Sequence, residues 1–233
     1  MIKYTYLLID VLSVVVPLIF SFHPRIRLYR HWKALFPAIL IVAAGYALWD
    51  ALFVHLGIWG FNPHYLTGFH LGNLPVEELL FFICIPYACV FTYECLSGFF
   101  AAKLSGINIK PFSYMFSGVM IIIAVIFHDK AYTASAFGLI AGLVLLGTLV
   151  KIPWLSEFYV IYGILLIPFL IVNGLLTGTG LEAPVVWYKG SGIMGPRIMT
   201  IPVEDVFYGM GLILLNIWLY TLMKDHKNNG TPS

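Results

Sequence analysis

The chain has 233 residues, of which 61% are hydrophobic and 10% are charged, with a mean hydropathy of +0.92. A soluble domain carries about a quarter charged residues, so this composition excludes a soluble globular protein and indicates an integral membrane protein. The formal net charge of +2 is too small to favour nucleic acid as a partner.

Apolar segments of roughly 20 residues, the length that crosses a bilayer as a helix, occur seven times along the chain. They lie near residues 4–22, 34–55, 75–97, 112–127, 132–150, 157–177 and 200–223. The expected fold class is therefore an all-α integral membrane protein with about seven transmembrane helices. Two long connections, 56–74 and 178–199, are rich in Gly, Pro and aromatic residues, and residues 224–233 are expected to form a disordered tail.

Lysine and arginine predict the orientation of these helices. With the amino terminus outside and the carboxyl terminus in the cytoplasm, nine basic residues lie on the cytoplasmic side and four on the outer side. This distribution agrees with the positive-inside rule. We expect a multi-pass protein of the cell inner membrane, oriented in this way.

Two acidic motifs, "PVEE" at Pro75–Glu78 and "PVED" at Pro202–Asp205, lie 127 residues apart, since 202 − 75 = 127. The same shift places the first three expected helices on the last three, and each motif follows one of the long connections. The sequence therefore predicts a tandem three-helix repeat of parallel halves. The expected parts are a first repeat at 1–110, a connector helix at 111–130 and a second repeat at 131–223.

Each motif places adjacent carboxylates at the beginning of an apolar helix. Pro75 and Pro202 suit the first helical position, which needs no N–H donor. The acids that follow, Glu77 with Glu78 and Glu204 with Asp205, then lie in the first turn, where the helix dipole favours negative charge. A single such acid would be an ordinary interfacial residue. Adjacent helical residues point about 100° apart, however, so at least one of each pair is expected to face the bundle.

Paired carboxylates inside a membrane protein predict acid–base chemistry. Ionisable groups within transmembrane segments mark functional sites. Two neighbouring carboxyl groups in a low-dielectric site do not both ionise easily, so one can act as an acid while the other acts as a base. Asp50, deep in the second helix, is the best additional candidate, whereas Asp10 could equally form an interhelical hydrogen bond. Aromatic faces beside an acid suit a carbocation intermediate. The expected substrate contacts are Trp49, Phe81, Phe82, Tyr208, Asn62 and Trp187.

We expect neither a cofactor nor a metal ion. The segment "GSGIMG" at 190–195 matches a dinucleotide fingerprint in letters only, because no strand–helix unit surrounds it. The three cysteines have no CxxC spacing, and the histidines around the first long connection show no metal-ligand spacing.

The duplicated P-x-E-[ED] motif resembles that of the membrane lycopene cyclase family, the small carotenoid cyclases of some bacteria, archaea and fungi. The "NP…TG…LPVEELLFF" context and the layout of three helices, connector and three helices support the resemblance, which covers residues 1–223. The second half departs from it, with no counterpart of the Trp49-Asp50 pair and no "FNPHY".

The resemblance implies cyclisation of the ψ-end of lycopene to a β-ionone ring, with lycopene and the lipid bilayer as partners. An acid would protonate the terminal double bond, the neighbouring double bond would attack the cation, and a base would remove a proton. Glu77, Glu78, Glu204 and Asp205 would be the proton donor and acceptor, with Asp50 assisting.

Three other functions stay open at this point. Capture of the same cation by water would make the protein a carotenoid hydratase, and a longer substrate would make it a C50 carotenoid cyclase. A proton-coupled transporter also combines intramembrane acids with internal repeats. Against the transporter, the halves show no obvious broken helices at the midplane.

Overall fold

The computed structural model describes residues 3–104 and 106–229, and no side chain beyond residue 225 is described. Within these residues the chain forms seven α-helices, which follow the expected segments closely. They are α1 (Thr5–Phe20), α2 (Trp32–His55), α3 (Val76–Leu104), α4 (Lys110–Ile126), α5 (Ala131–Leu149), α6 (Leu155–Leu176) and α7 (Val203–Asn229). A 3₁₀ turn, η1 (Leu28–His31), leads into α2, and a second, η2 (Pro63–Tyr65), lies in the first long connection.

Five of the helical segments are long and apolar enough to cross a membrane. They lie at Leu28–His55, Val76–Leu104, Ala131–Leu149, Leu155–Leu176 and Val203–Asp225. The helices α1 and α4 are apolar but shorter. Their exposed side chains are largely aliphatic, such as Leu8 and Leu12 on α1, which is the surface that lipid rather than water would cover. The chain is thus a multi-pass, all-α membrane protein, with five spans that satisfy both length and composition.

The two long connections contain short strands that the sequence analysis did not predict. The strands are β1 (Trp59–Phe61), β2 (His70–Leu71), β3 (Leu74–Pro75), β4 (Val186–Tyr188), β5 (Arg197–Ile198) and β6 (Ile201–Pro202). β2 and β3 form one tight hairpin, and β5 and β6 form another. At corresponding positions of the two hairpin turns, Gly72 and Met199 both have a positive φ, near 60°. The duplication therefore extends to the backbone conformation of the turns.

β1 and β4 come from different connections and pair antiparallel with each other. Trp59 pairs with Tyr188, Gly60 with Trp187 and Phe61 with Val186. The repeat shift of 127 relates Gly60 to Trp187, so the ladder is centred on one pair of equivalent residues. A two-fold relation between equivalent strands produces this reciprocal register.

The chain divides into two compact units. Unit 1 contains residues 1–52, 63–95 and 212–233, and unit 2 contains 53–62 and 96–211. Each unit contains residues from both halves of the expected repeat, and the repeat boundaries stay a prediction. The long helix α7 contributes its first nine residues to unit 2 and the remainder to unit 1, and β1 belongs with β4 in unit 2.

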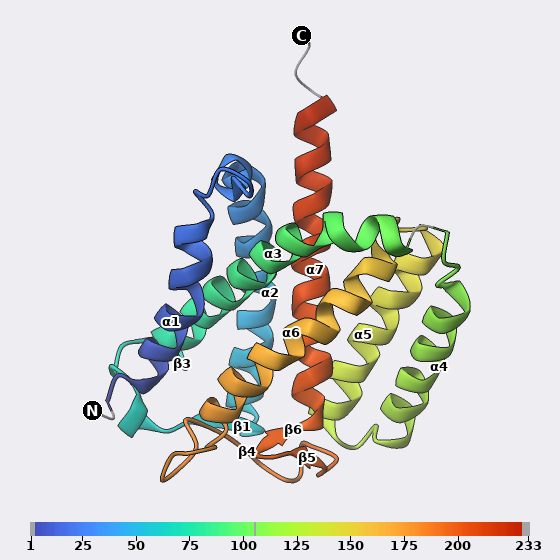
Figure 1. Cartoon of the computed structure of the whole chain (residues 1–233). Coiled ribbons are helices and arrows are strands. Elements are labelled where there is room, and N and C mark those ends of the chain that lie inside the picture. Colours follow the sequence, from blue (N-terminus) through green and yellow to red (C-terminus); the bar gives the residue numbers. More distant parts are fainter. Residues whose placement is uncertain (1–2, 105, 230–233) are drawn as a thin grey trace. The chain divides into compact units, whose positions relative to one another are not determined.

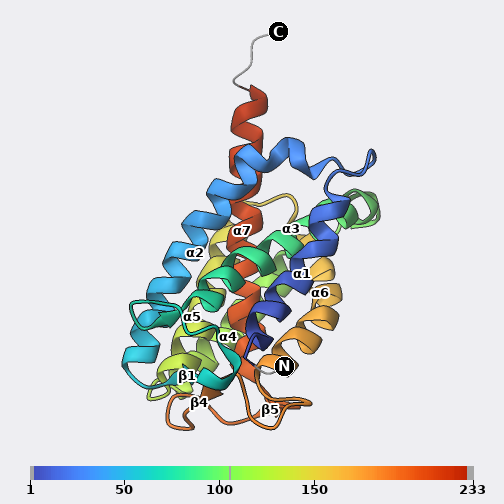
Figure 2. The same cartoon turned by 90° about the vertical axis from the view of Figure 1, so that its left-hand side faces the viewer.

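In unit 1, α1 lies beside the first part of α3 (Figures 1 and 2), and Tyr6 packs its ring edge-on against Phe81. Farther along, the Tyr87 hydroxyl bonds with Ser21 and accepts a hydrogen bond from Trp32. These side-chain hydrogen bonds of Tyr87 link α1, α2 and α3.

In unit 2, α4 and α5 run side by side, and β1, β4, β5 and β6 gather near the beginning of α7 (Figure 1). Phe137 of α5 packs against Phe207 of α7, and the Tyr162 hydroxyl of α6 donates to the backbone carbonyl of Val206. The first two turns of α7 are thereby fixed by α5 and α6.

Two expectations about helix ends are wrong. Pro75 and Pro202 are the last residues of β3 and β6, immediately before the first helical residue and not within the helix, because each proline pairs with a strand residue across its hairpin. The expected tail at 224–233 is helical as far as Asn229. Lys224 stabilises this extension through bonds of 2.8 and 2.9 Å to the two carboxylate oxygens of Glu94. Residues 230–233 lie outside the described residues.

Candidate active site

The first acidic motif is buried in unit 1. Glu77 and Glu78 occupy the first turn of α3, as expected, and Glu77 has no exposed surface. Glu77 Oε1 accepts a hydrogen bond of 2.6 Å from the backbone N–H of Thr67, ten residues earlier. Its Oε2 is buried and has no partner among the described residues. Burial of both acids excludes the simpler interpretation that they are exposed, dipole-matched residues.

Glu78 contacts two other helices of unit 1. The Tyr6 hydroxyl of α1 donates to Glu78 Oε2 over 2.5 Å. Asp50 of α2 is also buried, and its side chain lies next to that of Glu78. The structure therefore brings Asp50 into direct contact with the first motif.

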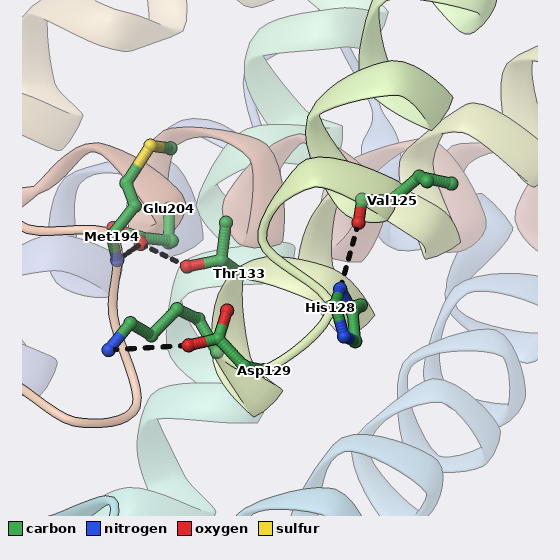
Figure 3. A network of polar contacts seen from close by, with 7 residues as sticks. Val125, His128, Asp129, Thr133, Met194 and Glu204 are labelled. Atoms are coloured by element: carbon green, nitrogen blue, oxygen red, sulfur yellow. Dashed lines mark hydrogen bonds and ion pairs between the residues drawn. The ribbon is translucent and has the colours of Figure 1, made fainter.

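The second acidic motif repeats this arrangement in unit 2. Glu204 and Asp205 occupy the first turn of α7, and Glu204 has no exposed surface. Glu204 Oε1 accepts a hydrogen bond of 2.7 Å from the backbone N–H of Met194, again ten residues earlier, and one of 2.5 Å from Thr133 (Figure 3). As in Glu77, Oε2 is buried without a partner among the described residues.

Asp205 is surrounded by hydrogen-bond donors. Tyr132 of α5 donates to Oδ1 over 2.7 Å, in the same way that Tyr6 donates to Glu78. Tyr188 of β4 and Asn173 of α6 donate to Oδ2 over 3.0 and 3.3 Å. Hydrogen bonds of this kind favour the ionised carboxylate, because a carboxylate can only accept.

An aromatic cluster surrounds Asp205. The ring of Tyr132 stacks on Tyr188 at 6.0 Å between centroids and meets Trp59 and Tyr208 edge-on at 4.9 and 5.8 Å. The ring of Phe53 packs against Trp59 in a tilted arrangement, with 4.8 Å between the centroids. Such rings present negative faces that attract a cation, so carboxylate and aromatic faces together form a site suited to positive charge.

The other expected substrate contacts fall into two groups. In unit 1, Phe81 and Phe82 pack next to the first motif, with Phe81 against Tyr6 and Phe82 against Tyr46, whose ring also contacts Trp49. In unit 2, Tyr208 lies in the aromatic cluster.

Asn62 and Trp187 lie at the β1–β4 ladder. The backbone of Asn62 bonds to Val185, next to the β1–β4 ladder. Trp187 is 43% exposed and covers Gly60, with its ring so close that a Cβ on Gly60 would lie 2.4 Å from it.

Sequence reasoning missed most of the donors to the carboxylates. Tyr6, Tyr132, Thr133 and Tyr188 were not among the candidates, although each bonds to an acidic motif. Tyr6 and Tyr132 each lie near the start of their helix and donate to the second acid of their motif. The repeat shift of 127 does not align them, because it places Tyr6 on Thr133. Tyr188 lies in the connection before α7, whereas Thr133 lies on α5.

A family model described as Lycopene cyclase matches residues 3–96 and again residues 129–223. The chain belongs to the lycopene cyclase family. The double match agrees with the internal repeat, and each matched region ends in the helix that carries one acidic motif. No curated protein and no solved structure matches the chain. Membership in the lycopene cyclase family supports a carotenoid cyclase activity and a carotenoid substrate for this membrane protein.

The loop that holds Glu204 depends on a close approach at Gly192. A Cβ at this buried glycine would lie 2.5 Å from Cγ2 of Ile58, which is itself buried. Gly192→Ala should therefore displace the loop that carries the Met194 N–H and lower the stability by about 1–3 kcal/mol. Thermal unfolding of the purified protein measures the loss. Gly190→Ala is the matched control, since nothing lies within 4 Å of its Cβ. Equal unfolding temperatures for both variants would contradict the prediction.

Proposed function

We propose that the protein is a lycopene β-cyclase, which converts the ψ-end groups of lycopene to β-ionone rings by redox-neutral acid–base catalysis. The observation that carries the proposal is the pair of buried carboxyl sites, one per repeat, with matching hydrogen bonds in a chain of the lycopene cyclase family. In the bilayer the amino terminus would lie outside and the carboxyl terminus in the cytoplasm.

The reaction needs a proton donor, a stabilised cation and a proton acceptor. The donor adds a proton to the terminal double bond, which leaves a tertiary carbocation. The neighbouring double bond attacks that carbon, so one carbon–carbon bond forms and the positive charge moves into the new ring. Loss of a proton to a base then restores a double bond, and no electrons are gained or lost.

The residues of the two motifs supply these roles in the proposal. Glu77, Glu78, Glu204 and Asp205 are the donor and acceptor groups, and Asp50 assists from its position next to Glu78. Carboxyls buried in low-dielectric surroundings act strongly on nearby charge. The rings of Phe81, Phe82 and Tyr208 would contact the polyene and stabilise the cation, whereas Trp49, Asn62 and Trp187 are proposed to contact more distant parts of the substrate.

Pigment analysis tests the proposal. The chain is expressed in bacteria engineered to accumulate lycopene, and extracted carotenoids are separated by liquid chromatography. We expect products with one or two β-rings. Hydroxylated acyclic pigments would replace the cyclase by a hydratase. Unchanged lycopene, with the protein present and folded in the membrane, would refute the proposal and favour a transporter.

A further inference from the structure

The segment that links α1 to α2 and includes the beginning of α2, residues 21–33, carries a cluster of basic side chains that the proposed reaction does not use (Figure 2). We call this segment the basic turn. Four exposed basic residues lie in it, namely Arg25, Arg27, Arg30 and Lys33. The sequence from residue 11 to residue 49 contains no aspartate or glutamate, so the turn carries positive charge only. The membrane-crossing segment Leu28–His55 begins inside it.

The three arginines of the basic turn are not neutralised by acids of the chain. The salt bridges found among the described residues lie elsewhere, at Asp129 and at Glu94. Arg30 contacts an aromatic ring instead: its Nε donates to the Tyr29 hydroxyl over 3.4 Å, and its guanidinium carbon lies 5.9 Å from the centroid of that ring. The guanidinium groups therefore keep donors and charge for an anion from outside the chain.

Exposed aromatic rings lie beside these arginines. The ring of Phe22 stacks on Tyr29 at 5.4 Å between centroids and meets Trp32 edge-on at 5.4 Å. Trp32 in turn meets Phe36 edge-on at 5.6 Å. Phe22 is 56% exposed, and Tyr29 and Phe36 are exposed as well. Tyrosine and tryptophan are enriched at the level of the lipid headgroups, so the basic turn has the composition of a membrane–water boundary.

The basic turn is held in one conformation by contacts on its inner side. Ser21 is buried, and its hydroxyl bonds with the Tyr87 hydroxyl of α3 at 2.6 Å. Leu28 has no exposed surface. The backbone N–H of Arg27 donates to the carbonyl of His23 over 3.0 Å. A surface that is ordered before it binds loses less conformational entropy on binding, so the turn is preorganised for a ligand.

The second repeat does not carry this cluster. The repeat shift of 127 places the four basic positions on Ile152, Trp154, Glu157 and Val160. None of these residues is basic, and Glu157 is acidic. The helices of the second repeat form without the cluster, so the repeated fold does not require it. The cluster is therefore best explained by an interaction with a ligand.

We propose that the basic turn is a binding surface for the headgroups of anionic phospholipids. The guanidinium groups of Arg25, Arg27 and Arg30 bind the phosphate oxygens, because their planar donors match the geometry of a phosphate. The exposed rings of Phe22 and Tyr29 contact the glycerol and the first acyl carbons. A phospholipid presents an anion next to hydrocarbon, which matches arginines next to exposed rings, whereas a soluble phosphate would leave the rings uncovered. This inference does not depend on the proposed catalytic function.

Lipid retention by the purified, full-length protein tests the surface. The protein in detergent is incubated with equal amounts of phosphatidylglycerol and phosphatidylcholine and separated by gel filtration, and the retained lipids are quantified by mass spectrometry. We expect the wild-type protein to retain phosphatidylglycerol preferentially. The triple variant Arg25→Gln, Arg27→Gln, Arg30→Gln should bind phosphatidylglycerol about tenfold more weakly or worse, because each basic residue near a membrane surface adds to the attraction for anionic lipid.

The matched control removes the same charge from exposed positions outside the basic turn. It is the triple variant Lys103→Gln, Lys110→Gln, Lys189→Gln. This variant should keep the preference for phosphatidylglycerol. Equal retention of the two lipids by the wild-type protein, or an equal loss of preference in the two triple variants, would overturn the proposal.

Two further measurements keep the test decisive if the glutamine variant does not fold. Replacing the same three arginines by lysine keeps the charge and should keep the preference, and a folded lysine variant without it would count against the proposal. For the wild-type protein, added salt should weaken the retention of phosphatidylglycerol, because salt screens exposed charges. Retention that does not change with salt would assign it to the acyl chains. Inorganic phosphate that displaced the lipid at equal concentration would make the turn a site for soluble anions, and either result would overturn the proposal.

Discussion

Glu78→Gln should lower the rate of ring formation by about 10²–10⁴-fold, the range that a general acid or base contributes, while the protein stays folded in the membrane. Glutamine has the size of glutamate but cannot give up or hold the transferred proton. It can still accept the hydrogen bond of the Tyr6 hydroxyl, so the contact between α1 and α3 is kept. Rates are measured from the carotenoid products of purified protein.

The control for this variant is Glu182→Gln, which makes the same chemical change at an exposed position in the connection before β4. It should cyclise lycopene as the wild-type protein does. Equal unfolding temperatures for the wild-type protein and both variants would show that folding is not the cause of any loss. A Glu78→Gln variant with wild-type activity would remove Glu78 from the mechanism.

Asp205→Asn should lower the rate of ring formation by about 10²–10³-fold, comparable to the loss of a preorganised electrostatic group in other enzymes. The change removes the proton-transferring carboxyl group that the aromatic cluster surrounds. It also places an amide NH₂ against donors, so part of the hydrogen bonding by Tyr132, Tyr188 and Asn173 is lost. Each such bond contributes roughly 1 kcal/mol, so the variant should also unfold at a lower temperature.

Two comparisons separate the role of the Asp205 carboxyl group from the effect of losing its hydrogen bonds. Tyr188→Phe removes one donor and leaves the carboxyl group of Asp205, so it should lower the stability but reduce the rate far less than Asp205→Asn. The parallel change Glu204→Gln tests the neighbouring acid, which is bonded to Thr133 and Met194. If Tyr188→Phe and Asp205→Asn had equal rates, the carboxyl group of Asp205 would have no special role in catalysis.

Much of the fold was predictable because hydrophobic length defines membrane helices. Each α-helix lies where an apolar segment predicted it, and both acid pairs lie in the first turn of α3 and α7, as the position of the prolines suggested. The short strands were missed because a two- or three-residue strand leaves no pattern in the sequence. Their partners, such as Gly60 and Trp187, lie far apart along the chain.

The site was predictable only in part. Intramembrane acids are rare, so Glu77, Glu78, Glu204, Asp205 and Asp50 stood out by residue type alone. Tyr132, Tyr188 and Asn173 did not, because tyrosine and asparagine also serve as ordinary packing and capping residues, and only the tertiary fold brings them to Asp205. The catalytic roles of the acids stay a prediction.

The most direct test of acid–base cyclisation is the fate of the added proton. Purified protein is equilibrated in D₂O and given lycopene, and the cyclised product is analysed by mass spectrometry. The mechanism predicts one deuterium in each ring formed, because one deuteron is added and one hydrogen is lost, and it predicts no electron donor. Rings that form without deuterium, or only when a reductant is supplied, would contradict it.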